Sequence, residues 1–444
     1  MIDLSPEIVT IIMLGGVLVG VLIGYPLAIP VGAVGLIMGF LLFGTGVFDL
    51  LYARLFKLVH SYVLLAIPLF VFMGVMLERS GITERMYAAL YLWLSGFRGG
   101  LAIITVLIGT ILAACVGIIG ASVTMLALLA LPSMIKRGYS KSLASGSVCA
   151  GGTLGILIPP SIMLVIFGPM AGISVGKLFM AAFIPGLVLS GLYITYIAVR
   201  CFFQTKIAPA VPVEERAVPF LKKTATLVAS LVPPGLLILA VLGSIFFGIA
   251  PPTEAAAVGA LAATILTIAY RRFSFEVLSD TALQTLKVTS MILLIGGLSF
   301  AFVGVFIPAG GAKVVEAVIM GTPGGYWGAF AMVMFIIFLL GFFIDWIGII
   351  FIMVPILAPI APALGFDPLW FGMMIIINLQ MSFMTPPFAA AIFYLRGSAP
   401  PELGVTMGDI IRGVFPFVGL IMIGLSLCVA FPQIILWLPA QMIK

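Results

Sequence analysis

Two adjacent prolines interrupt a long apolar stretch late in the chain. Residues 378–387 (NLQMSFMTPP) carry four polar side chains and end in Pro386 and Pro387. Proline has no backbone N–H, so each one leaves a carbonyl of the preceding turn without its helical partner. Inside hydrocarbon, such a break survives only where it is packed in protein or lines a wet cavity. Residues 151–160 (GGTLGILIPP) repeat it, and two matched breaks in a membrane protein indicate a transporter's binding site.

The rest of the sequence is apolar enough for a membrane protein. The 444-residue chain is 63% hydrophobic and 8% charged, whereas a soluble domain is about 25% charged. Its apolar runs suffice for about ten crossings of ~20 residues each. The net charge of +6 indicates basic loops rather than a nucleic-acid surface, because no basic run with interleaved aromatic residues occurs. We therefore predict an all-α polytopic protein in a lipid bilayer.

The second half of the sequence repeats the first. Gly24 corresponds to Gly248 and Pro132 to Pro355, and the first double proline corresponds to the second at almost the same separation along the chain. An ordered series of such matches predicts two structural repeats. Because a central site reached from both membrane faces is naturally built from inverted repeats, we expect the two halves to be inverted.

Asp345 is the most unusual single residue. It lies in the apolar segment 342–348 (FFIDWIG), and a carboxylate at mid-membrane costs ~2.5–3.5 kcal/mol on insertion scales. A cation or a fixed hydrogen-bond donor must compensate. At the separation that relates Pro132 to Pro355, its counterpart is Ser122, within residues 120–124 (GASVT). We expect Asp345 and Ser122 to help order two related ion sites; the alternative is a helix cap or an interface residue at the end of a span.

The broken segments also offer oxygen ligands. Hydroxyl and amide oxygens suit a small hard cation, whereas Cys or His would indicate a transition metal. Na⁺ fits this chemistry, and a proton-coupled site is not separated from it by oxygen ligands alone. Half-helix N-termini at the breaks can also face an anion, and the alternative is that these side chains bond within or between helices. The side chains are Thr153 and Ser161 in the first half, and Asn378, Gln380, Ser382 and Thr385 in the second.

Motifs for other classes of function are missing from the sequence. His60 is the only histidine, which argues against a histidine-based metal site. Residues 172–177 (GISVGK) have the wrong spacing for a phosphate loop, and Leu178 replaces the required Ser or Thr. No metalloprotease or nucleophile-elbow motif occurs. An intramembrane enzyme and a nucleotide-driven pump are therefore disfavoured, and a structural or assembly protein would not need matched polar breaks.

Five segments of the sequence carry a resemblance to a known family: 67–70 (IPLF), 120–122 (GAS), 152–161 (GTLGILIPPS), 344–345 (ID) and 384–387 (MTPP). Over essentially its whole length the chain resembles the large membrane subunit, DctM, of tripartite ATP-independent periplasmic (TRAP) transporters. The resemblance implies a fold of the ion-transporter superfamily, with two inverted repeats that each bear a re-entrant hairpin and a broken helix and that work as an elevator.

The resemblance also implies partners and an energy source. Such subunits work in the bacterial inner membrane with a small membrane subunit (Q type) and a periplasmic substrate-binding protein (P type). The binding protein delivers an organic acid, and a Na⁺ gradient drives import without a nucleotide cofactor. Because residues 1–50 hold only two predicted spans, we expect the small subunit to be a separate chain. Proton coupling and transport without a binding protein remain alternatives. Within the family, residues 393–397 (FYLRG) look like the corresponding segment of branches that handle oxo or hydroxy monocarboxylates, mannitol-type or aromatic substrates.

Carried onto this chain, the resemblance implies two Na⁺ sites with the substrate between them, near the double prolines. Candidates for the first Na⁺ site are Gly120, Ser122, Thr124, Gly152, Thr153 and Pro159. Candidates for the second are Asp345, Gln380, Ser382 and Thr385. Candidates for substrate contact are Pro160, Ser161, Ser299, Asn378, Pro386 and Pro387.

The elevator interpretation divides the chain into fixed and moving parts. Residues 200–223 hold five basic side chains against Glu214 and Glu215, which predicts a cytoplasmic loop. The predicted division is a scaffold part over 1–51, a transport part over 52–200, the loop over 201–225, a second scaffold part over 226–287 and a second transport part over 288–444.

Overall fold

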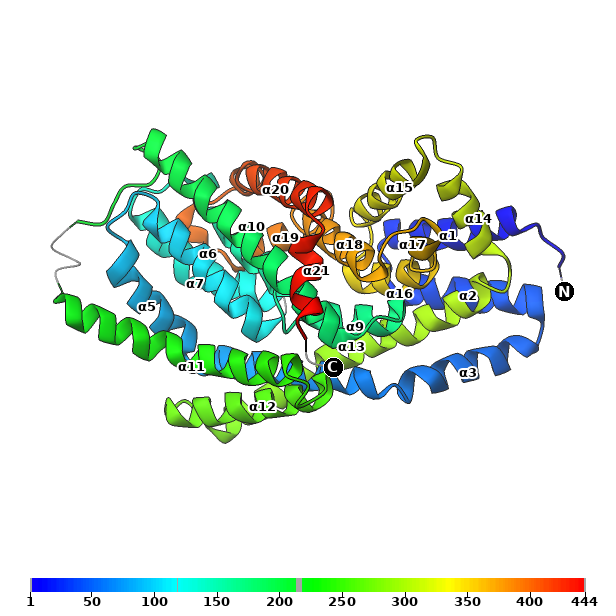
Figure 1. Cartoon of the computed structure of the whole chain (residues 1–444), viewed down its shortest axis with the longest axis horizontal. Coiled ribbons are helices and arrows are strands. Elements are labelled where there is room, and N and C mark those ends of the chain that lie inside the picture. The colour runs from blue at the N-terminus through cyan, green and yellow to red at the C-terminus, as the bar shows by residue number, and fades with distance from the viewer. Residues whose placement is uncertain (1, 118, 213–217, 443–444) are drawn as a thin grey trace.

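The computed structural model describes residues 2–117, 119–212 and 218–442, and all regular structure in these ranges is helical (Figure 1). Helices follow from the composition, because in hydrocarbon a segment must satisfy its own backbone N–H and C=O groups. Within the described ranges, eight helices are long and apolar enough to cross a membrane, and shorter apolar helices accompany them. The predicted all-α polytopic membrane protein is thus confirmed.

The first half begins with an apolar helical hairpin that turns at Gly24, where a φ of +102° favours glycine. A break between α6 and α7 lies beside Gly117. The helices of this half are α1 (Pro6–Leu22), α2 (Ala28–Phe43), α3 (Gly46–Val59), η1 (Tyr62–Leu65), α4 (Ala66–Arg79), α5 (Ile82–Leu94), α6 (Gly100–Val116), α7 (Ile119–Lys136), α8 (Lys141–Thr153), η2 (Leu154–Ile156), α9 (Ile162–Ala171) and α10 (Val175–Phe203).

The second half begins beyond the predicted loop, of which Glu214, Glu215 and Arg216 lie outside the described residues. Its helices are α11 (Phe220–Phe246), α12 (Pro252–Ala269), α13 (Phe275–Phe306), α14 (Gly311–Met320), α15 (Gly325–Leu340), α16 (Trp346–Leu357), α17 (Ile360–Ala363), α18 (Pro368–Ser382), α19 (Ala390–Ser398), η4 (Pro401–Leu403), α20 (Met407–Ala430) and α21 (Gln433–Ala440).

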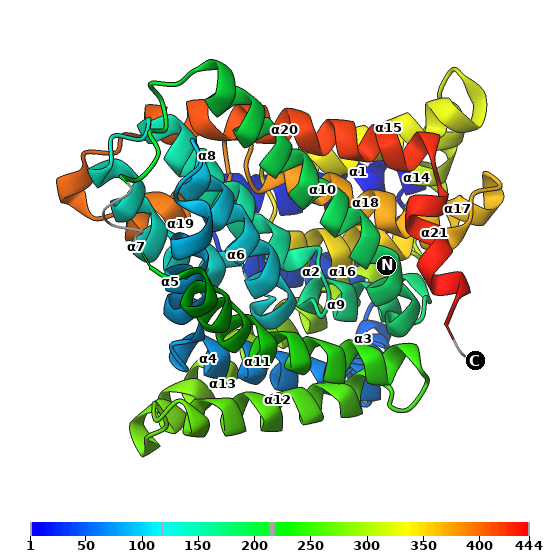
Figure 2. The same cartoon turned by 60° about the vertical axis from the view of Figure 1, so that its left-hand side comes forward.

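Packing between the halves is reciprocal. By the sequence repeat, α2 is equivalent to α12, and α4 to the end of α13; α2 packs against α13, and α12 packs against α4. In the same way α9 contacts α16, while its equivalent α19 contacts α7, the equivalent of α16. Figures 1 and 2 show α9, α16 and α18 near the middle of the molecule, with first-half α5–α7 at one end. Such an exchange of equivalent contacts is expected of two repeats related by an approximate two-fold axis.

All four predicted part boundaries fall inside continuous helices. The boundaries after residues 51, 200, 225 and 287 lie within α3, α10, α11 and α13, respectively. A continuous helix transmits rigid-body motion, so a hinge is better placed at a helix end. The division itself stays a prediction.

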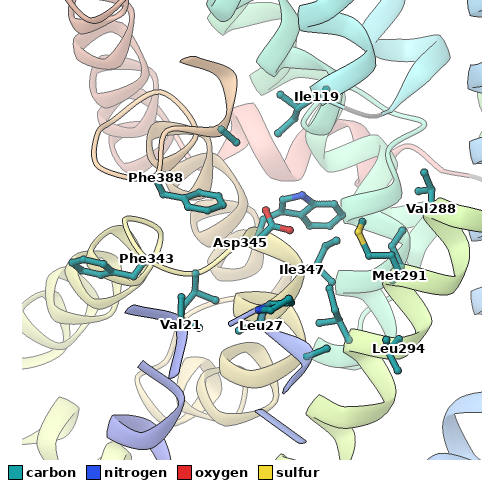
Figure 3. Close-up of a pocket in the computed structure, with 18 of the residues that line it drawn as sticks. Val21, Leu27, Ile119, Val288, Met291, Leu294, Phe343, Asp345, Ile347 and Phe388 are labelled. Atoms are coloured by element: carbon teal, nitrogen blue, oxygen red, sulfur yellow. The ribbon is translucent and has the colours of Figure 1, made fainter. Parts of the chain in front are cut away.

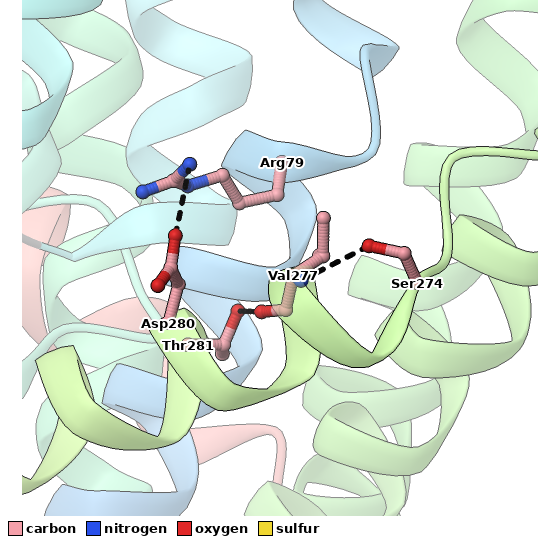
Figure 4. A network of polar contacts seen from close by, with 5 residues as sticks. All are labelled: Arg79, Ser274, Val277, Asp280 and Thr281. Carbon is pink, nitrogen blue, oxygen red and sulfur yellow. Dashed lines mark hydrogen bonds and ion pairs between the residues drawn. The ribbon is translucent and has the colours of Figure 1, made fainter.

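A polar corner joins the end of α4 to the start of α13 (Figure 4). Ser274 caps α13 by accepting a hydrogen bond from the Val277 N–H at 3.1 Å. Arg79 faces Asp280 across 3.8 Å, and both side chains are almost half exposed. Such a pair contributes about 0–1 kcal/mol, so it guides the docking of these helices more than it stabilises them.

Candidate functional site

Both double-proline segments are breaks between helices, as the sequence predicts. In the first half α8 ends at Thr153, a short 3₁₀ turn follows, and α9 begins after Ser161 in extended backbone. In the second half α18 ends at Ser382 and α19 begins at Ala390. Both double prolines contain a cis peptide bond. The two breaks therefore share a construction as well as a sequence pattern.

The two breaks touch each other at equivalent residues. The Gln380 Nε2 donates to the Thr153 carbonyl oxygen at 2.8 Å, and both residues are fully buried. Along the chain, these two positions have the same separation as the two double prolines. Equivalent residues of two repeats can contact each other only close to the axis that relates the repeats. The hydrogen bond therefore marks the centre of the molecule.

A cavity of about 850 Å³ lies beside this centre. One wall is formed by the α1–α2 turn and by α13. The other is formed by the starts of α7, α9 and α16, by Ile156 of the first break and by the second break. Figure 3 shows Val21, Leu27 and Met291 of the first wall facing Ile119 and Phe388 of the second. The lining is predominantly apolar, so the cavity accommodates a ligand with a hydrocarbon body.

Asp345 is the one carboxylic acid in the lining of this cavity, as far as the described residues go. It occupies the N-cap position of α16, in extended backbone, and is half-buried. Its carboxylate points into the space between the two walls (Figure 3). No Lys, Arg or His side chain of the described residues lines the cavity. The protein thus presents an anionic group there without a counter-charge.

Four candidate residues carry a buried oxygen with no hydrogen-bond partner. A buried unpaired hydroxyl or amide oxygen costs ~1–3 kcal/mol. The Ser122 Oγ lies against the first break, because a Cβ on Gly155 would be 3.4 Å from it. Unsatisfied oxygens near both breaks could bind a small cation, although buried unpaired polar atoms also occur elsewhere in the described chain. The four oxygens are Ser122 Oγ, Ser299 Oγ, Ser382 Oγ and Gln380 Oε1.

Four other candidates are occupied by bonds within the protein. The Thr124 Oγ1 accepts from Ser398 at 3.0 Å and ties α7 to α19. The Asn378 Nδ2 donates to the Met334 carbonyl at 2.6 Å, and the Thr385 Oγ1 to the Met381 carbonyl at 2.8 Å. The Ser161 Oγ donates to the Ile156 carbonyl, within its own break. These bonds fix the broken segments, and they leave lone pairs on the hydroxyl and amide oxygens.

The structure brings only some of the candidates to the cavity surface. Gly120, Asp345 and Pro387 line it, whereas Pro386 is half-buried and outside the lining. The first-half residues Gly152, Thr153, Pro159, Pro160 and Ser161 are buried behind it, and Ser299 lies in α13 but does not line it.

Sequence reasoning missed Tyr25 and Tyr394, which line the cavity from opposite walls. The Tyr394 ring packs over Gly120, where a Cβ would lie 3.1 Å from it. The sequence does place each tyrosine next to a notable feature: Tyr25 follows Gly24 in the first turn, and Tyr394 follows the second break closely. These positions do not predict that either side chain faces the centre of the molecule.

Comparisons with known proteins agree on one family. Residues 14–434 match the model of the "Tripartite ATP-independent periplasmic transporter, DctM component" family. The "C4-dicarboxylate TRAP transporter large permease protein DctM" of Pseudomonas aeruginosa is 31% identical over 387 residues, which are 87% of this chain and 88% of that one. The "Isethionate TRAP transporter permease protein DctMQ" of Oleidesulfovibrio alaskensis is 28% identical over 414 residues, which are 93% of this chain and 63% of that one.

A solved structure shows a similar fold. The YdaH transporter of Alcanivorax borkumensis, described as having an unusual topology, superposes with a TM-score of 0.61. The match covers 87% of this chain and 89% of that one, at 16% sequence identity. At that identity the likeness concerns the fold alone.

Proposed function

This chain belongs to the DctM family of tripartite ATP-independent periplasmic transporters, and on that premise we propose that it imports a small organic acid together with Na⁺ by an elevator movement. As a member of the family it is a large permease subunit, a multi-pass protein of the bacterial inner membrane. A periplasmic substrate-binding protein would deliver the acid. A small membrane subunit would complete the transporter; in the relative named DctMQ, the longer chain is consistent with a fusion of the two membrane subunits.

The observation that carries the proposal is the charge of the cavity. Asp345 faces the cavity, and no basic side chain of the described residues balances it there. A substrate carboxylate 4 Å from another carboxylate is repelled by about 4 kcal/mol at an effective dielectric constant of 20. Binding therefore needs a cation that enters with the acid, which is the physical basis of co-transport.

The residues present fit Na⁺ as that cation. The unpaired oxygens of Ser122, Ser382 and Gln380 are hard donors, and their satisfaction by an ion would remove a cost of burial. Thr153 and Asp345 would complete the two predicted sites. The protein's own task is to hold these oxygens in place, and the hydrogen bond between Gln380 and Thr153 does so across the axis.

A proton is the alternative cation, because protonation of Asp345 would also remove the repulsion. Purified transporter in liposomes, supplied with the binding protein and its acid, separates the two. We expect uptake to follow an inward Na⁺ gradient and to be unaffected by a pH gradient in Na⁺-free buffer. Uptake driven by the pH gradient alone would show that the coupling ion is a proton and not Na⁺. Uptake that requires ATP would refute secondary transport.

The side chains that line the cavity limit the class of organic acid that can bind there. The lining offers apolar and aromatic side chains, among them Met291, Trp346 and Phe388, and one carboxylate. A dicarboxylate would place its second charge against Asp345 or an apolar wall, whereas a monocarboxylate can place its hydrocarbon body there. We therefore propose a monocarboxylate with an apolar or aromatic body, which calorimetry on the cognate binding protein would test. Tighter binding of a C4-dicarboxylate would refute it.

The elevator proposal predicts that the transport parts move past the α1–α2 turn, which belongs to the scaffold part. Leu27 lines the cavity from the α1–α2 turn, in the scaffold part, whereas Gly348 is a buried residue of α16, in the transport part, next to the lining residue Ile347. A Cβ built on Gly348 would be 2.2 Å from the Leu27 Cδ2, so Leu27→Cys with Gly348→Cys should form a disulfide. Oxidation should stop uptake and reduction should restore it, with each single variant as control. Full uptake by the oxidised protein would refute movement at this contact.

A further inference from the structure

A second cavity, of about 200 Å³, lies where α3 crosses α13. Its polar groups are Arg54, Lys57 and Ser61, from α3 and the residues just after it. Its apolar walls come from α13, α16 and the last turn of α9. It shares no lining residue with the cavity of Asp345. We call it the Arg54 crevice.

The cationic groups of the Arg54 crevice have no partner in the described part of the chain. Neither Arg54 nor Lys57 forms an ion pair or a side-chain hydrogen bond with a described residue, and no carboxylate of the described chain lines the crevice. The Ser61 hydroxyl is likewise unbonded within the described chain. Two positive charges and a hydroxyl around one small cavity are the usual components of an anion site.

The position of Arg54 is built into the helix packing. A Cβ on Gly304 of α13 would lie 3.1 Å from the Arg54 Cγ and 3.3 Å from its Nε. The arginine stem thus runs through a groove that exists because residue 304 is glycine. Arg54 is held in the crevice by packing, which lowers the entropy lost when an anion binds.

The exposed side chains on the outer face of α3 indicate that the crevice lies at the membrane interface. Tyr52, Phe56 and Val59 are exposed by 69%, 50% and 79%. An amphipathic helix that presents aromatic and aliphatic side chains outward lies in the membrane interface. The occupant therefore comes from the bilayer. It must combine a negative charge with an apolar body, because the crevice combines two positive charges with apolar walls.

We propose that the Arg54 crevice binds the headgroup of an anionic phospholipid, with the phosphate at Arg54, Lys57 and Ser61. The lipid would link the second half of α3 to α9 and α16, and the elevator proposal assigns all three to the transport parts. Binding itself does not depend on that proposal, because the crevice is separate from the transport cavity.

Titration of the detergent-purified protein with short-chain phosphatidylglycerol, followed by native mass spectrometry, tests the site. Two basic side chains near an anionic headgroup contribute enough that Arg54→Gln with Lys57→Gln should weaken binding about thirty-fold. Arg54→Lys should retain binding within a few-fold, because the charge remains. The double control Lys222→Gln with Lys223→Gln removes the same charge from α11 and should bind like the wild type.

Three results would overturn the proposal. Unchanged phosphatidylglycerol binding in the Arg54/Lys57 double variant would place the lipid elsewhere. Equal binding of phosphatidylcholine would show that the headgroup charge is not recognised. Equally tight binding of inorganic phosphate would indicate a site for a free anion. A failure of Na⁺-driven uptake would leave all these outcomes unchanged, so the two proposals fail separately.

Discussion

Replacement of Gln380 by methionine separates a structural role of this residue from an ion-binding one. Methionine matches glutamine in length and shape but has neither amide group. The change removes the hydrogen bond to the Thr153 carbonyl and leaves that carbonyl unpaired, at a cost of ~1–3 kcal/mol. It also removes the buried unpaired Oε1, which recovers a similar amount. The free energy of unfolding without Na⁺ should therefore change by no more than ~1–2 kcal/mol.

The response to Na⁺ should change much more. A ligand present at 100 times its dissociation constant stabilises the folded state by about 2.7 kcal/mol. If Gln380 Oε1 binds Na⁺, the wild type should unfold a few degrees higher in NaCl than in choline chloride, and Gln380→Met should lose most of that gain. Thermal unfolding in detergent, followed by intrinsic fluorescence, measures both quantities. Gln284→Met on the exposed face of α13 is the matched control and should keep the full Na⁺ gain.

Two results would refute this reasoning. A Gln380→Met protein that gains as much from Na⁺ as the wild type would show that its amide oxygen does not bind the ion. A variant that unfolds far below the wild type in choline would show that the bond to Thr153 holds the two breaks together, and that the unpaired oxygen costs little.

Three further perturbations test other parts of the structure. Asp345→Asn should lower Na⁺-driven uptake at least tenfold while the unfolding temperature stays or rises, since a half-buried carboxylate is lost; reduced stability would assign Asp345 a structural role. Gly146→Ala should destabilise by ~1–3 kcal/mol, because its Cβ would lie 2.2 Å from the carbonyl oxygen of residue 413. Gly191→Ala, with open space around it, should be neutral or stabilising by up to ~1 kcal/mol, and equal unfolding temperatures for the two variants would contradict this packing. A double-mutant cycle on Arg79 and Asp280 should give less than ~1 kcal/mol of coupling, and a larger value would show that the corner stabilises the fold.

The sequence predicted the elements whose causes are local. Prolines end or interrupt helices wherever they stand, so the breaks at Pro159 and Pro386 were readable from the chain. The separation of the two double prolines, which the sequence shows, also relates Thr153 to Gln380. It did not predict that they meet, because contact on an axis depends on how two repeats dock in three dimensions.

The parts of the site that sequence could not supply depend on the direction of side chains. Gly120 was a candidate ion ligand, yet in the structure it also makes room for the Tyr394 ring. Periodicity does not resolve which face of a helix meets a cavity when almost every side chain is apolar. For the same reason the crevice around Arg54 was not predicted: its glycine partner, Gly304, lies in the other half of the sequence.

The two repeats differ in chemistry at equivalent positions, and the difference bears on the direction of transport. Asp345 and Pro387 line the cavity, whereas their equivalents Ser122 and Pro160 are buried. A strictly two-fold arrangement would expose both pairs or neither, so the cavity is asymmetric at these two positions. On the elevator proposal, the other access state exposes the side that holds Ser122, and Asp345 becomes enclosed. Enclosure of a carboxylate in hydrocarbon without a counter-charge is costly, so the movement is favourable only with a cation bound, and that dependence couples the acid to the ion.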